Sequence, residues 1–434
     1  MKTHVPFTRD EVLAAALTYF HGDDLAATTW VNKYALRNER GELVEKDPAD
    51  MHRRMAREFA RIERSYTPLP TEHKALLSNY GRQRTALDEE RIFQLFADFR
   101  DVVPQGSVMA SLGDPYRLAS LSNCVVVPSP LDSYGGIFRV DQQLAQLFKR
   151  RCGVGFDLST LRPEGAAVSN AARTSTGAVS FMERFSNTTR EVAQKGRRGA
   201  LMLTMDIAHP DVEKFITIKQ DLAKVTGANV SVRVSDEFLR AVDADAEFTL
   251  RWPIDAKDPI VSKQVNAREL WHTLITCAHR TAEPGVIFWD RQHLYSTSSV
   301  YPGFRNESTN PCSEIAMQGG DSCRLIAINL YSFVTDAFTP RARFDHERFA
   351  HVTYEAQRLM DDLVDLELEA VDRILAKVEH DPEPDETKRV ERETWELLRD
   401  TGRKGRRTGL GFTGLADALA ALNLKYDGDA ALFA

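Results

Sequence analysis

The chain has 434 residues, of which 43% are hydrophobic and 27% charged, so it is long enough for one large or two ordinary globular domains. Its net charge of −7 argues against a general nucleic-acid-binding protein, which is normally basic. No stretch approaches the roughly 18 apolar residues of a membrane-spanning helix, and the N-terminus lacks a signal peptide's apolar core. Five widely spaced cysteines form no secreted disulfide framework, so we expect a cytoplasmic protein with neither a membrane nor a nucleic-acid partner.

Residues 1–85 are predicted to be helices joined by polar connections. Asp47 and Pro48 form a helix-start signal, and apolar residues follow it at helical spacing. These residues are Met51, Met55, Phe59 and Ile62. A second amphipathic helix is predicted from Asp88. Such stripes are typical of a packed core rather than of a cofactor site.

Strands and helices alternate in the rest of the chain. Short apolar runs predict strands at 121–127, 201–207, 230–234, 248–252, 286–289 and 325–330. Helical patterns cover 267–281 and 345–379, and Asp381-Pro382-Glu383-Pro384 breaks the second one. Cys277 and His279 have no partner cluster nearby, so we expect a helix-packing cysteine and no metal site.

Three polar or glycine-containing segments suit close approach to a ligand. Gly155 lets the backbone come near either a neighbouring element or a ligand. Residues 170–177 form a small polar loop, and residues 195–200 form a basic one. Asp132 precedes a predicted helix, where a helix N-cap is the alternative to a binding role.

The stretch Asn310-Pro311-Cys312-Ser313-Glu314 places a thiol between an amide and a carboxylate. Pro311 favours an extended conformation at Asn310, and in an extended segment Asn310, Cys312 and Glu314 would face one space. The sulfur can then exchange a hydrogen atom, the carboxylate can take a hydroxyl proton, and the amide can orient that hydroxyl. The alternative is an inert buried cysteine.

Cys323 follows this stretch, and Cys124 lies far upstream in Ser122-Asn123-Cys124-Val125. Together with further motifs in the same order, these residues resemble the ribonucleotide reductases, most closely the dimeric type of the adenosylcobalamin-dependent class II. The further motifs are 151–156 (RCGVGF), 161–165 (LRPEG), 194–200 (QKGRRGA), 209–211 (HPD) and 409–414 (GLGFTG).

The resemblance implies an α/β fold. It predicts an N-terminal helical region at 1–85 and, at 86–434, the N-terminal portion of a ten-stranded α/β barrel of the reductase type. Because the sequence stops at Ala434, partway through that barrel, we expect the barrel to be incomplete. We also expect the chain to need a C-terminal remainder of the reductase for activity.

The resemblance further implies a mechanism. Cys312 would become a thiyl radical with adenosylcobalamin as cofactor, Glu314 would act as a base, and Asn310 would hold the sugar. Cys124 and Cys323 would supply two electrons as a dithiol that a thioredoxin-type reductant restores.

Binding residues are also implied. Substrate contacts are expected from Ser107, Asn123, Gly155, Asn310 and Glu314, the substrate being a ribonucleoside di- or triphosphate. A deoxynucleotide effector would meet Asp132, Lys195, Arg197 and Arg198, near the interface of a homodimer.

Three rival interpretations remain open. One is a class I reductase large subunit, which takes its radical from a separate protein. Another is a non-catalytic, nucleotide-binding regulatory half-barrel. The third is a nicotinamide dehydrogenase built on Gly409, Gly411 and Gly414, whose spacing is that of a dinucleotide-binding turn.

Overall fold

The computed structural model describes residues 6–66, 77–192 and 199–432. These residues divide into two compact units. The first unit contains residues 1–123, 323–374 and 406–434, and the second contains residues 124–322 and 375–405. Helix α14 (His346–His380) runs through one boundary between them.

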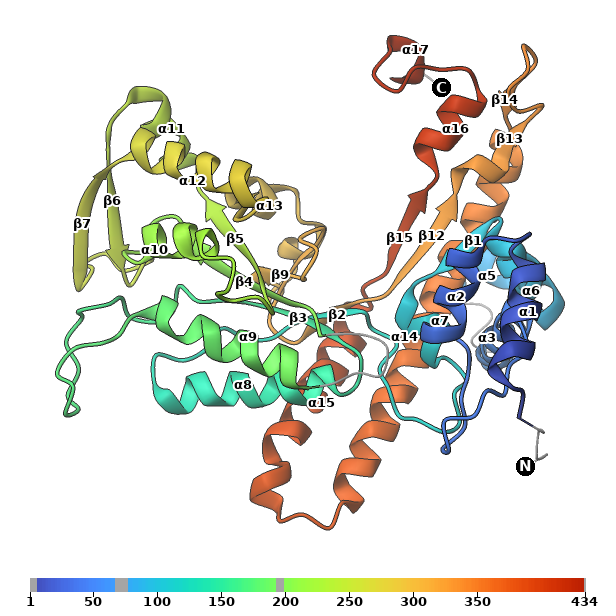
Figure 1. Cartoon of the computed structure of the whole chain (residues 1–434), viewed down its shortest axis with the longest axis horizontal. Coiled ribbons are helices and arrows are strands. Elements are labelled where there is room, and N and C mark those ends of the chain that lie inside the picture. The colour runs from blue at the N-terminus through green and yellow to red at the C-terminus, as the bar shows by residue number, and fades with distance from the viewer. Residues whose placement is uncertain (1–5, 67–76, 193–198, 433–434) are drawn as a thin grey trace. The chain divides into compact units, whose positions relative to one another are not determined.

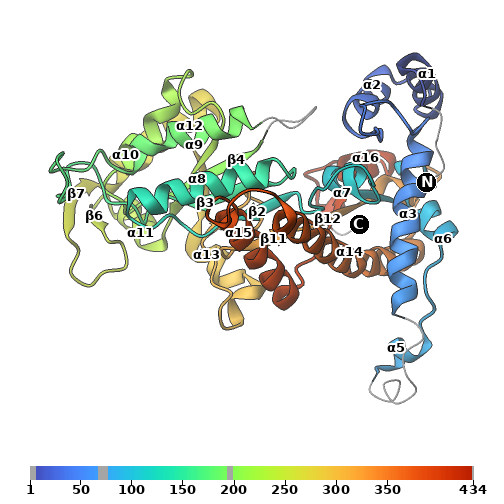
Figure 2. The same ribbon diagram turned by 90° about the horizontal axis from the view of Figure 1, so that it is seen from below.

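The first unit is mainly helical. Its elements before the first boundary are α1 (Arg9–Tyr19), α2 (Asp24–Lys33), α3 (Pro48–Ser65), α5 (Asn79–Gln83), α6 (Glu89–Phe96), β1 (Val102–Pro104) and α7 (Gly106–Ser111). Helix α3 begins after Asp47, whose side chain accepts from the N–H groups of Ala49 and Asp50, and α6 begins after its N-cap Asp88. Both predicted helix starts are therefore confirmed. Helix α6 packs along α3, as Figure 2 shows.

The predicted stripe on α3 lies in the core of this unit. Met51, Met55 and Phe59 are fully buried, and they pack in a single cluster with side chains of α6 and α14. Burial of this kind stabilises a helix more than intrinsic propensity does.

The remaining elements of the first unit include a small sheet. They are β12 (Leu325–Asn329), β13 (Val334–Thr335), β14 (Arg343–Phe344), β15 (Gly409–Thr413), α16 (Leu415–Ala421) and α17 (Asp429–Leu432). Strand β12 pairs antiparallel with β1 and parallel with β15. Gly409 and Gly411 therefore lie within a strand, so the glycine turn that the nicotinamide dehydrogenase alternative requires is not formed by these two residues.

The second unit is built on a largely parallel sheet. Among the described residues its strand order is β11-β2-β3-β4-β5-β8, and β2, β3, β4, β5 and β8 run parallel. The strands are β2 (Cys124–Val126), β3 (Gly153–Asp157), β4 (Leu201–Asp206), β5 (Asn229–Val234), β8 (Gly285–Phe288) and β11 (Asp321–Cys323). Every residue of β2 and β3 is buried, as expected for strands covered on both faces.

Helices flank this sheet (Figure 1). Helices α8 and α9 pack on β3 and β4, and α10 packs on β4 and against α12. The helices of this unit are α8 (Tyr134–Phe148), α9 (Met182–Glu191), α10 (Val212–Thr217), α11 (Asp236–Ala244), α12 (Ala267–Thr281), α13 (Trp289–Tyr295) and α15 (Asp385–Gly405). Two further pairs of strands are β6 (Glu247–Trp252) with β7 (Val261–Asn266), and β9 (Ser308–Thr309) with β10 (Ala316–Met317). The predicted mixed α/β architecture is confirmed, although the described strands do not close into a barrel. No described helix is both long and apolar enough to cross a bilayer.

A buried pair of carboxyl groups joins α3 to α14 in the first unit. Glu63 is fully buried and Asp362 is 1% exposed. Glu63 accepts hydrogen bonds from Arg358 and from the Leu87 N–H. Burial, together with the charge of Glu63 and a hydrogen bond to it, raises the pKa of Asp362 to about 8, while the charges of Arg358 and Arg84 act in the opposite direction. Two carboxyl groups can share a hydrogen bond only while one of them is protonated.

Replacing Asp362 with asparagine is expected to remove a pH dependence of stability. Between about pH 4 and pH 8 folded Asp362 keeps a proton that the unfolded chain releases, so the free energy of unfolding falls as pH rises, by up to about 1.4 kcal/mol per pH unit. The amide of Asp362→Asn carries its own hydrogen-bond donor at every pH. In denaturant unfolding, the free energy of unfolding of Asp362→Asn relative to that of the parent should be higher at pH 8 than at pH 5. Asp361→Asn, at the exposed neighbouring position of α14, is the control. An equal difference between Asp362→Asn and the parent at both pH values would contradict the prediction.

Candidate functional site

The Cys312 segment is a tight turn between β9 and β10. The Ser313 N–H donates to the Asn310 carbonyl at 3.0 Å, and Ser313 has a left-handed φ of 64°. The expectation of an extended segment is therefore wrong, and alternation along a strand does not explain the grouping of Asn310, Cys312 and Glu314. Pro311 lies inside the turn, where its fixed φ is equally well accommodated.

The side chain of Asn310 helps to close this turn. Its Oδ1 accepts the Ile315 N–H at 3.3 Å, and the backbone N–H of Asn310 donates to the Ile315 carbonyl at 3.3 Å. Asn310 is fully buried, yet its Nδ2 has no hydrogen-bond partner among the described residues. A buried amide donor without a partner costs about 1–3 kcal/mol, so this group is suited to receive an acceptor oxygen from a ligand.

Cys312 and Glu314 are both exposed on the same turn. All five cysteines lie in the described part of the chain, and Cys312 is the exposed one, whereas Cys124, Cys152, Cys277 and Cys323 are buried. The turn is anchored to the sheet, because Asn229 of β5 donates to the Pro311 carbonyl at 3.0 Å. The thiol is thus presented at the tip of a fixed turn.

Strand β9 lies directly on the parallel sheet. A Cβ added at Gly155 of β3 would come within 1.8 Å of the Thr309 carbonyl oxygen. The close approach predicted at Gly155 is therefore an approach to a neighbouring element. Whether Gly155 also meets substrate stays a prediction.

An arginine whose side chain is 11% exposed fixes the start of β9, and sequence reasoning did not assign it a role. Arg233 of β5 pairs with Asp157 at 3.1 Å and Asp206 at 3.5 Å, and it donates to the Glu307 carbonyl at 2.9 Å. Its guanidinium lies 4.6 Å from the centre of the Trp289 ring. Three strands and the residue just before β9 are thus tied together at their carboxyl ends, which is where parallel sheets carry their sites.

Two other predicted substrate residues meet in the first unit. The Ser107 N–H donates to Asn123 Oδ1 at 2.9 Å, and Asn123 Nδ2 in turn donates to Gln105. Ser107 and Asn123 are both buried, and Ser107 Oγ has no partner in the described part of the chain.

Cys124 begins β2 and Cys323 ends β11, and these strands are neighbours in the sheet order. The pairing of their sulfur atoms stays a prediction.

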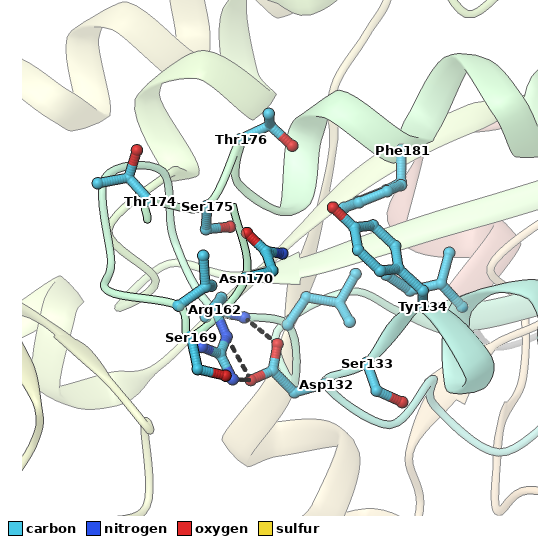
Figure 3. Close-up of a pocket in the computed structure, with 13 residues that line it drawn as sticks. Asp132, Ser133, Tyr134, Arg162, Ser169, Asn170, Thr174, Ser175, Thr176 and Phe181 are labelled. Atoms are coloured by element: carbon cyan, nitrogen blue, oxygen red, sulfur yellow. Dashed lines mark hydrogen bonds and ion pairs between the residues drawn. The ribbon is translucent and has the colours of Figure 1, made fainter. Parts of the chain in front are cut away.

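A pocket of about 270 Å³ opens at the start of α8 in the second unit (Figure 3). The aromatic rings of Tyr134 and Phe181 form one wall, with centroids 6.2 Å apart. Polar side chains of the loop after Val168 line the other wall: Ser169, Asn170, Thr174, Ser175 and Thr176. An aromatic face opposite hydroxyl and amide groups can accept a planar, polar ligand.

Asp132 lies in this pocket, paired with Arg162. Its carboxylate accepts the Arg162 backbone N–H at 3.0 Å and the Nε–H at 2.8 Å, and Figure 3 shows both contacts. Ser133, whose side chain accepts the Gly136 N–H, is the N-cap of α8, so the N-cap alternative for Asp132 is wrong. Lys195, Arg197 and Arg198 lie outside the described residues.

Arg162 and Tyr134 were missed as pocket residues by sequence reasoning. Arg162 stands in the 161–165 motif that supported the family resemblance, so a signal was present without an assigned role. Tyr134 offered no signal, because an aromatic residue at a helix start is more often part of a core. Cys277 is a buried residue of α12, as predicted, and burial raises the pKa of its thiol.

The second unit is thus a parallel α/β sheet with a cysteine turn held against it, by Asn229 at the start of β5 and by the contact of Thr309 with Gly155 of β3. Two family models match this chain: "Ribonucleotide reductase, all-alpha domain" over residues 21–117 and "Ribonucleotide reductase, barrel domain" over residues 122–433. The chain belongs to the ribonucleotide reductase family. The predicted fold, a helical N-terminal region followed by part of a reductase barrel, is confirmed.

The similar curated proteins are named as ribonucleotide reductases. A vitamin B12-dependent ribonucleoside-diphosphate reductase of Thermoplasma acidophilum is 30% identical, over 91% of this chain and 52% of its own length. The protein of the same name from Mycobacterium tuberculosis strain H37Rv is 30% identical, over 94% of this chain and 50% of its own length. A ribonucleoside-diphosphate reductase large chain of Neurospora crassa is 24% identical over 72% of this chain. The chain thus spans about half the length of the curated relatives that it matches most fully.

Proposed function

We propose that this chain takes part in reducing ribonucleotides to 2′-deoxyribonucleotides and carries the cysteine that forms the radical. The observation that carries the proposal is the β9–β10 turn. It combines an exposed thiol at Cys312, an exposed carboxylate at Glu314 and a buried amide at Asn310 whose Nδ2 has no partner among the described residues. A ribose with two adjacent hydroxyl groups supplies what such a set can use: a hydrogen atom, an acidic proton and an acceptor oxygen.

The proposed chemistry assigns one step to each group. The Cys312 thiyl takes the ribose 3′-hydrogen atom and becomes a thiol. Glu314 accepts the 3′-hydroxyl proton while Asn310 donates to the sugar, and the 2′-hydroxyl leaves as water after protonation. Cys124 and Cys323 give two electrons and two protons and become a disulfide, and Cys312 returns its hydrogen atom to C3′. General-base assistance of this kind contributes about 10²–10⁴-fold to a rate.

The cofactor that fits this arrangement is adenosylcobalamin, which the names of the bacterial and archaeal relatives also suggest. When bound, it supplies a carbon radical that takes a hydrogen atom from a thiol. Cys312 fits that requirement because its thiol is exposed on a fixed turn, whereas the other cysteines are buried. A thioredoxin-type dithiol would reduce the Cys124–Cys323 disulfide after each cycle, and this suits a protein of the cytoplasm.

The pocket at Asp132 is proposed to bind a deoxynucleotide effector. Tyr134 can stack on a base, while the hydroxyl groups of Thr174, Ser175 and Thr176 can donate to sugar or phosphate oxygens. Tyr134 and Phe138 are exposed on α8 and stack with centroids 6.1 Å apart. An exposed aromatic pair on a helix is typical of an interface, so we propose that this face joins two copies in a homodimer.

An assay of cytidine diphosphate reduction tests the proposed function. Reaction mixtures contain adenosylcobalamin and a dithiol, with the chain alone or with the chain plus the part of the Thermoplasma relative to which it does not align. We expect deoxycytidine diphosphate in at least one mixture, formed without any metal-bearing partner protein. Product that forms equally well without adenosylcobalamin would contradict the proposed cofactor, and product that forms only after a separate radical-generating protein is added would support the class I interpretation. Absence of product in both mixtures, together with absence of nucleotide binding, would contradict the proposal.

A further inference from the structure

The polar wall of the Asp132 pocket is a small hairpin. The Gly165 N–H donates to the Ser175 carbonyl at 2.9 Å, and the Ser175 N–H donates to the Ala166 carbonyl at 2.8 Å. Ala167 and Thr174 form a bridge between its two arms. Neither arm belongs to the parallel sheet, so the position of this wall depends on what holds the two stems together.

The two stems meet at the carboxylate of Asp211. The Glu164 N–H, on the first stem, donates to Asp211 Oδ1 at 3.0 Å, and the Ala178 N–H, on the second stem, donates to Oδ2 at 2.9 Å. Asp211 is 5% exposed. One buried carboxylate therefore clamps both ends of the pocket wall, and hydrogen bonds to a charged acceptor are the stronger kind.

Gly177 makes this clamp sterically feasible. A Cβ at Gly177 would lie 2.5 Å from Asp211 Oδ2 and 2.8 Å from the Glu164 nitrogen, so a side chain there would displace the carboxylate. Gly165, at the other end of the hairpin, has a similar φ of 79° against 85° for Gly177, but a Cβ at Gly165 would meet no atom within 4 Å. The two glycines thus share a positive φ and differ in their contact with Asp211.

His209 fixes the carboxylate in turn. The Asp211 N–H donates to His209 Nδ1 at 3.0 Å, so the ring proton lies on Nε2, which donates to the Leu161 carbonyl at 2.9 Å. His209 is fully buried, and burial lowers its pKa, so the ring is neutral. Leu161 itself lines the pocket. His209 therefore connects Asp211 to Leu161, the pocket residue next to Arg162.

We infer that His209 and Asp211 are positioning residues of the nucleotide pocket: they hold its polar wall at the distance from Tyr134 that a bound nucleotide needs. The inference deepens the proposed effector role and rests on it. The inference assigns a role to the 209–211 motif, whose residues take no part in the proposed reaction. Neither residue is expected to contact the nucleotide.

Binding of dATP, dGTP and dTTP to the 434-residue chain by calorimetry tests the inference. Asp211→Ala should raise the Kd of the preferred nucleotide about 10-fold, because the wall loses two hydrogen bonds to a charged group. Asp211→Asn keeps one acceptor oxygen and should recover part of that loss. Gly177→Ala should weaken binding about as much as Asp211→Ala, whereas Gly165→Ala, which also has a positive φ but leaves Asp211 untouched, should stay within about twofold of the parent.

The outcomes separate the clamp from simple loss of folding. Melting temperatures are recorded for every variant, and if Asp211→Ala does not fold, the comparison of Gly177→Ala with Gly165→Ala decides. Equal effects of the two glycine variants, or an unchanged Kd in a folded Asp211→Ala, would overturn the inference and leave the proposed pocket intact. If the parent chain binds no nucleotide, or binds it equally well after Asp132→Ala, the proposed effector role fails, and the inference fails with it.

Discussion

Replacing Cys312 with serine is expected to abolish formation of 2′-deoxyribonucleotide. Serine has the same shape as cysteine with a smaller, more polar terminal atom, and position 312 is exposed, so the β9–β10 turn should keep its geometry. An O–H bond is too strong to exchange its hydrogen atom with a carbon radical under these conditions, and the first step would stop. The measurement is product formation under the reaction conditions in which the parent chain is active, with nucleotide affinity measured in parallel.

A matched variant separates this effect from a general need for thiols. Cys277→Ser changes a buried cysteine on α12, at a position to which we assign no chemistry. It should lower stability, because a hydroxyl group replaces a thiol in a packed site, while turnover of the folded fraction stays near that of the parent. Turnover by Cys312→Ser above a few per cent of the parent rate would remove the radical role from Cys312.

Gly155→Ala is expected to destabilise the second unit severely. The new Cβ would lie 1.8 Å from the Thr309 carbonyl oxygen, and the two nearest atoms, O and C of Thr309, belong to the backbone, so no side chain can turn away. Strand β9 would have to separate from β3, at a cost of about 3 kcal/mol or more. Urea unfolding of the parent and the variant measures this loss.

The comparison variant is Gly411→Ala in β15, where an added Cβ meets no atom within 4 Å. It should change the free energy of unfolding by less than about 1 kcal/mol, in the stabilising direction, because alanine restricts the unfolded chain. If Gly155→Ala proved no more destabilising than Gly411→Ala, β9 could not lie where the structure places it.

Local signals predicted much of the fold. The N-caps at Asp47 and Asp88 marked two helix starts, and the helix predicted at 267–281 matches α12 residue for residue. These elements depend on capping and on short-range apolar periodicity, which a sequence displays directly. The glycine spacing at 409–414 also allows a turn, and the sequence cannot exclude it, because it is pairing with a distant strand, β12, that holds residues 409–413 extended.

The candidate site was predicted unevenly, for physical reasons. Residue types identified Asn310, Cys312 and Glu314 as a chemical set, but the turn that carries them depends on the left-handed Ser313 and on the Asn310 amide. The role of Asp132 depends on Arg162, which lies 30 residues further along the chain. Both contacts join residues that only the folded chain brings together, so the spacing of residues in the sequence does not predict them.

The exposed position of Cys312 has a practical side. A sulfhydryl-directed label added to the native chain should modify this sulfur before the other four, which the folded protein shields. The chain therefore carries a built-in attachment point for a spin or fluorescent reporter, placed where the proposed radical would reside.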